Sequence, residues 1–138
     1  MKGLRKKTKN KAEQIRSRCV IIAKQINKIQ ANYKCDYCGA GKPERMVNSH
    51  HIFNEGANRS MSADLDNLIC VCVVHHGVGR FLRGDKFGFH KTPAEAMEWF
   101  KGKYPKRYEI LRKRARHTQQ ADEMFWTKKL EELKGFVK

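Results

Sequence analysis

The chain has 138 residues, and its 30 lysines and arginines outnumber its 14 aspartates and glutamates, which gives a net charge of +16. That length suits one ordinary domain and excludes a large barrel or a two-domain enzyme. So much charge of one sign repels itself unless a polyanion neutralises it. We therefore expect nucleic acid as the first partner to consider and an acidic membrane surface as the second. No apolar run approaches the roughly 20 residues of a membrane span, and no apolar signal stretch follows the lysine-rich start. These features predict a cytoplasmic protein that does not enter a membrane.

The N-terminal part divides into a basic arm, residues 1–11, and a basic amphipathic helix, residues 12–34. In the helix the apolar residues recur in steps of four and three, which is the spacing of one helix face. They are Ile15, Cys19, Ile22, Ile26 and Ile29. This face predicts a helix packed on the core of the domain. The same steps also form a heptad seam, so a homodimer through residues 12–31 is the alternative.

The remaining chain predicts an α+β fold. Residues 35–91 are rich in glycine, cysteine and histidine, and two strand-like segments, 47–53 and 68–74, flank a polar loop. Residues 92–138 are helical in pattern. Thr92 followed by Pro93 is typical of a helix start, Gly102 of its end, and Pro105 opens the next helix. A last amphipathic segment covers about 121–133.

The cysteines indicate a metal site. Their number, five, is odd, and a reducing compartment disfavours a disulfide framework. Cys35 and Cys38 form a C-x2-C knuckle followed by a glycine, which permits the tight turn that aims both thiolates at one point. The second half of the site is either a C-x2-H pair, Cys72 with His75, or a C-x-C pair, Cys70 with Cys72. We favour Cys35, Cys38, Cys72 and His75 as a structural zinc site, with Cys70 as a buried strand residue.

The histidines carry a resemblance to a known family. His50 and His51 are adjacent, as are His75 and His76, and neighbours on a strand point to opposite faces. The order of the His50-His51 pair, Asn67 and the final Cys72-x2-His75-His76 resembles the HNH nuclease motif. The Cys35–Cys38 knuckle is similar to that of the zinc-bound subgroup, in which a cysteine usually stands at the place of His75. The resemblance covers about residues 35–91, and the Phe89–Pro93 run resembles small phage proteins of this type, encoded by bacteria or phages.

The resemblance implies a fold and a role for each residue. The fold is a ββα-metal (His-Me) finger with structural zinc knuckles, flanked by basic α-helices. His51 would be the general base that activates water, and His50 and His76 would bind one catalytic Mg²⁺ or Mn²⁺. Asn67 would tie the loop to the strand of His51, and Arg59 in the loop could clamp phosphate. His90 could be an extra metal ligand or a turn residue, and we favour the turn residue.

The expected function is that of a metal-dependent DNA endonuclease with low sequence specificity. Basic residues outside the finger would contact phosphates, which position a duplex without reading its sequence. They are Lys6, Lys7, Arg16, Arg18, Arg112, Lys113, Arg114 and Arg116. Two alternatives remain open: a structure-selective recombination nuclease acting on branched DNA, and a non-catalytic zinc DNA-binding module.

Overall fold

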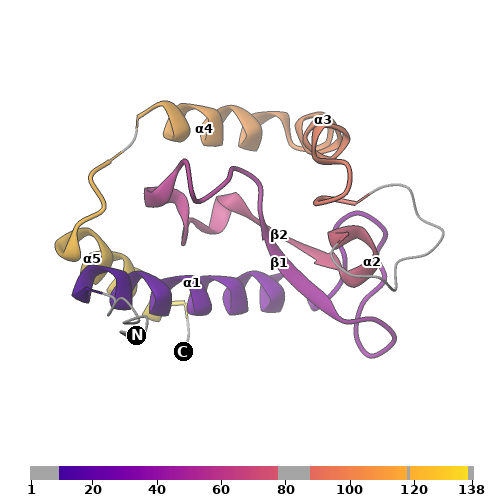
Figure 1. The fold of residues 1–138 in the computed structure, drawn as a ribbon. Helices are drawn as coiled ribbons and strands as arrows, with labels where there is room; N and C mark the ends of the chain where they lie inside the picture. The colour runs from indigo at the N-terminus through magenta and orange to yellow at the C-terminus, as the bar shows by residue number, and fades with distance from the viewer. Residues whose placement is uncertain (1–9, 78–87, 118, 137–138) are drawn as a thin grey trace, which may run out of the picture.

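The computed structural model describes residues 10–77, 88–117 and 119–136, which form a mixed fold of helices around one small sheet (Figure 1). The basic arm, with Lys6 and Lys7, lies outside the described residues. The elements in chain order are α1 (Lys11–Gln30), β1 (Val47–His51), η1 (Arg59–Met61), η2 (Leu65–Asn67), β2 (Leu68–Cys72), α2 (Val73–His76), α3 (Pro93–Lys103), α4 (Pro105–Arg116) and α5 (Glu123–Lys134). The α+β class expected from the sequence is therefore confirmed at this level. None of the described helices combines the length and the apolar character that a membrane span requires.

The sheet is a single antiparallel pair, β1 with β2, and its register runs from Val47 opposite Cys72 to His51 opposite Leu68. All five residues of β2 are buried, because helices cover the sheet on both sides. In Figure 1, α1 and α5 lie below the sheet and α3 and α4 lie above it. Both strands fall within the segments that the sequence predicted, and both are shorter than those segments.

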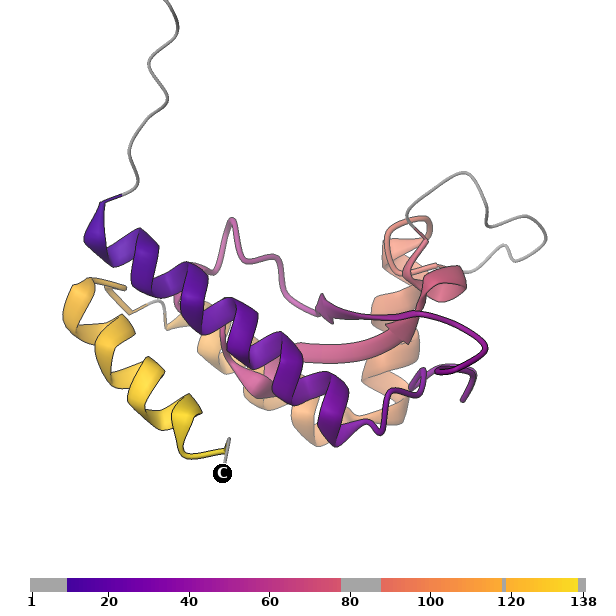
Figure 2. The same cartoon turned by 90° about the horizontal axis from the view of Figure 1, so that it is seen from below.

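The face of α1 that carries Cys19 and Ile26 packs against α5. Both residues are buried in one cluster with Trp126, Leu130 and Leu133 of that helix. Figure 2 shows the two helices side by side from below. The prediction that this helix packs on the core of the domain is thus confirmed within one chain. Ile29, the last residue of the apolar face, is nevertheless exposed. A homodimer through residues 12–31 remains a prediction.

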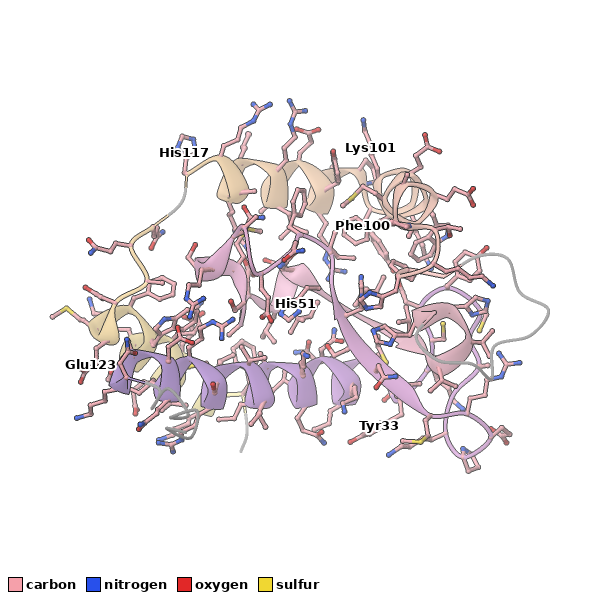
Figure 3. The ribbon with its side chains drawn as sticks, in the orientation of Figure 1. Tyr33, His51, Phe100, Lys101, His117 and Glu123 are labelled. Carbon is pink, nitrogen blue, oxygen red and sulfur yellow. The ribbon has the colours of Figure 1, made fainter. Side chains whose placement is uncertain are left out.

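A second apolar cluster joins α3 and α4 to the other side of the sheet. Phe100 and Leu111 are fully buried there against Val71 and Ile69 of β2. In Figure 3 Phe100 points inward from α3, whereas its neighbour Lys101 points away from the molecule. Two details at α3 differ from the sequence expectation. The helix passes Gly102 and ends one residue later, and the hydroxyl of Thr92 bonds to the backbone of Gly88 instead of capping the helix.

Candidate metal centres and the cleft between them and α1

The four residues favoured as zinc ligands lie together. The ligand atoms of Cys35, Cys38, Cys72 and His75 are all within 4.8 Å of one another. The sulfurs of Cys38 and Cys72 are 3.7 Å apart, and Nδ1 of His75 is 3.3 Å from the sulfur of Cys72 and 3.9 Å from that of Cys35. With zinc bonds of about 2.3 Å to sulfur and about 2.0 Å to nitrogen, tetrahedral ligands lie about 3.5–3.8 Å apart. Both the donor set and its spacing therefore fit a zinc ion.

Local turns bring these ligands together. Gly39 has a φ of 80°, which a glycine adopts without strain, and its N–H donates to the carbonyl of Cys35 at 2.8 Å. Cys72 is the last residue of β2, and His75 lies one turn further on in α2. The corner between α3 and α4 then covers the knuckle, because the Tyr104 hydroxyl donates to both carboxylate oxygens of Asp36.

The thiols of this group differ in acidity. Burial raises the pKa of Cys35 to about 12, so its thiolate requires a cation beside it. Burial also acts to raise the pKa of Cys72. Hydrogen bonds to its sulfur, from the backbone of His75 and from the side chains of Arg45, His75 and Cys38, outweigh that effect and lower the pKa to about 6. Cys70 lies two residues earlier in β2, outside the group, and burial raises its pKa to about 11. The C-x2-H pair, and not the C-x-C pair, therefore completes the cluster.

A second cluster consists of histidines only. The ring nitrogens of His50, His76 and His90 all lie within 4.8 Å of one another, and the Nε2 atoms of His76 and His90 are 3.0 Å apart. His90 does lie in a turn, as we interpreted it, but two backbone bonds fix that turn against α2. The N–H of Phe89 donates to the carbonyl of His75 at 2.7 Å, and that of His90 to the carbonyl of His76 at 3.0 Å.

Positive charge is suppressed on two of these histidines, His50 and His76. Burial, followed by repulsion from His90 and His76, lowers the pKa of His50 to about 3. Burial and the neighbouring His90 lower the pKa of His76 to about 4. Both rings are therefore neutral near pH 7, which is the form in which imidazole binds a metal. Three imidazoles leave coordination positions for other ligands, as an open metal site requires.

His51 follows His50 on β1 and lies on the side that faces α1 (Figure 3). Its Nε2 is 2.7 Å from the carbonyl oxygen of Ser62 and 3.4 Å from Oε2 of Glu55. Since a carbonyl oxygen only accepts, Nε2 carries the hydrogen and Nδ1 is the nitrogen that can take up a proton. The side chain is thus held in one tautomer by the loop that follows it.

Asn67 fixes that loop to the end of β1. It is fully buried, and its side-chain amide donates to the carbonyls of Phe53, at 3.0 Å, and Met61, at 3.2 Å. Its Oδ1 accepts from the N–H of Phe53 at 2.8 Å. These contacts hold both ends of the loop, and with it Ser62, next to His51.

An open cleft of about 600 Å³ connects these groups. The second histidine cluster and His51 line it together with Glu55 and two lysines of α1, Lys24 and Lys28.

No family model matches the chain, and no curated protein or solved structure matches it. A function for this site therefore has to be inferred from its geometry alone.

Several basic residues that the sequence marked for phosphate contacts are paired with acids. Arg59 forms an ion pair with Glu13 and does not line the cleft. Arg16 lies between Glu13 and Glu55, and its Nε donates to Ser62. On α4, Arg114 bonds to Asp64 and Asp66, and Arg112 lies 3.8 Å from Glu109. Arg18, Lys113 and Arg116 are exposed.

The sequence interpretation left the role of His90 open between a metal ligand and a turn residue, and it did not include Lys24 and Lys28 among the expected phosphate contacts. The lysines are four residues apart on α1, on either side of Ile26, and this spacing was the one signal that they share a face. No local signal could decide between the two roles of His90, since its position depends on the backbone bonds to α2.

Proposed function

We propose that the protein is a metal-dependent endonuclease of the HNH type that hydrolyses DNA phosphodiester bonds with low sequence specificity. The observation that carries this proposal is the convergence of three imidazoles, His50, His76 and His90, beside a fourth histidine, His51, whose ring is held in one orientation. The order β1, loop, β2 and α2 supports a ββα-metal finger, although α2 has only four residues. The Cys3His cluster would hold a structural zinc ion that staples this finger.

Each of these residues would have a distinct role in such a reaction. His51 would take a proton from the attacking water on Nδ1, because Nε2 is committed to Ser62. Asn67 keeps the loop, and so the orientation of His51, in place. His50, His76 and His90 would hold one divalent ion such as Mg²⁺ or Mn²⁺. When bound, that ion would stabilise negative charge on the scissile phosphate and on the leaving 3′ oxygen. The products would carry 5′-phosphate and 3′-hydroxyl ends.

The test uses supercoiled plasmid with the wild type and His51→Ala, in Mg²⁺, Mn²⁺, Ni²⁺ or no added metal. We expect metal-dependent nicking by the wild type and a loss of at least about a hundredfold in His51→Ala, since general base catalysis contributes about 10²–10⁴. Zinc content and DNA binding must be equal in the two proteins. Salt-sensitive DNA binding without cleavage in any metal would reject the nuclease and favour the non-catalytic zinc DNA-binding module.

A further inference from the structure

Two lysines of α1 form the wall of the cleft that faces the histidines. Lys24 and Lys28 line the same cleft as His50, His76 and His90, and both are partly buried. Four residues along an α-helix span about 6 Å, so the two ammonium groups follow one edge of the cleft. Among the described residues, no carboxylate forms an ion pair with either lysine, whereas Arg16 on the same helix bonds to Glu13 and Glu55.

The helix that carries these lysines is held firmly on the sheet. Asn27, which lies between them, donates to the carbonyl of Leu68 at 3.2 Å and accepts from the Ser49 hydroxyl at 2.8 Å. Ala23 and Ile26 are buried on the opposite side. This anchoring sets the rotation of α1, and the rotation in turn directs the two lysines to the cleft.

The charges of the cleft call for an anionic ligand. An imidazole that binds a metal is neutral, so the clustered histidines would not offset the charge of a bound cation. Among the described residues that line the cleft, Glu55 is the one carboxylate, and it is already shared by Arg16 and His51. Two ammonium groups opposite a divalent ion would therefore leave an excess of positive charge, which a row of phosphates neutralises.

We propose that Lys24 and Lys28 bind the sugar-phosphate backbone of a DNA strand and hold it against the histidine cluster. The inference deepens the proposed nuclease function and rests on it. It assigns α1, which carries no part of the HNH resemblance, to the substrate-binding surface. The strand then lies between α1 and the short segment of His90.

The experiment measures binding of a labelled DNA duplex to zinc-loaded His51→Ala protein by fluorescence anisotropy, across a series of NaCl concentrations without other divalent ions. Lys24→Ala/Lys28→Ala is compared with Lys106→Ala/Lys128→Ala in the same background. The control removes the same charge from exposed positions on α4 and α5 that do not line the cleft. Zinc content checks that each variant is folded.

Each phosphate contact contributes about 0.9 to the slope of log K against log salt concentration, so the cleft variant should lose about 1.8 units. Its affinity at 0.1 M salt should fall about tenfold to a hundredfold, and that of the control by much less. Equal losses in the two variants, or no binding by the parent protein, would overturn the inference. Cleavage is scored separately, with His51 restored. A cleaving protein without lysine dependence refutes only this inference, whereas lysine-dependent binding without cleavage refutes only the nuclease.

Discussion

The two candidate metal clusters share α2, but they differ in their ligand atoms and in how open they are. His75 and His76 are adjacent in α2, yet His75 is 4% exposed and faces three sulfurs, whereas His76 faces the open cleft. Four protein ligands close the first cluster, which is typical of structural zinc. Three imidazoles leave the second cluster open to solvent and ligand. One turn of helix therefore serves both a closed and an open site, and each can be perturbed while the other is monitored.

The largest effect should come from removing a ligand of the closed cluster. Cys72→Ala leaves the remaining thiols without a tetrahedral site, and we expect loss of zinc with more than about 4 kcal/mol of destabilisation. Cys70→Ala is the matched control, because Cys70 is equally buried in the same strand but lies outside the group. Zinc content by mass spectrometry and urea unfolding separate the two variants. If Cys70→Ala loses the zinc and Cys72→Ala retains it, the assignment of the closed cluster is wrong.

Asn67→Ala should have the next largest effect, and it should spare the zinc. It leaves the N–H and carbonyl of Phe53 and the carbonyl of Met61 without their partner, which costs about 2–3 kcal/mol. Nicking activity should fall as well as stability, because the loop no longer orients His51. Thermal unfolding and zinc content check this result. Asn58→Ala, which removes an exposed loop bond to the carbonyl of Asn54 and does not line the cleft, is the control and should change little.

The sequence predicted the closed cluster better than the open one for a physical reason. The C-x2-C turn with Gly39 and the C-x2-H turn of α2 are local, so their spacing already determines where the ligands point. His90 reaches the open cluster only through backbone bonds between two segments that are 14 residues apart. Charge was likewise a poor guide to phosphate contacts, because Arg16, Arg59 and Arg114 meet Glu55, Glu13 and Asp64, carboxylates that only the fold brings close. The helices were predictable from their apolar periodicity and start signals, but the packing of α1 on α5 was not.

His90→Ala tests whether His90 is a metal ligand of the open cluster. We expect Ni²⁺ affinity at this cluster to fall at least about tenfold, since one of three imidazole ligands is lost. The zinc should remain bound, and stability should change by less than about 0.5 kcal/mol because His90 is exposed. Titration calorimetry with zinc-loaded protein measures the affinity. His117→Ala, at an exposed histidine that does not line the cleft, is the control. Unchanged Ni²⁺ affinity in His90→Ala would show that His90 is a turn residue only.

The smallest effect expected is the part of the pH dependence of stability that the open cluster contributes. The pKa of His50 is about 3 in the folded protein, below the ordinary value of 6.5, so the unfolded chain binds more protons between these values. Stability from this neutral ring is therefore complete above pH 6.5 and is lost as the pH falls toward 3. The thiolates of the closed cluster also bind protons in acid, but they do so in the wild type and in His50→Ala alike. The difference between the two proteins isolates the contribution of the imidazole.

We expect the wild type to lose on the order of 1 kcal/mol more than His50→Ala between pH 7 and pH 5, measured by urea unfolding without added second metal. Equal losses would mean that His50 is charged as easily in the folded protein as in the unfolded chain. His50 would then not be the neutral metal ligand that an open site of this kind requires.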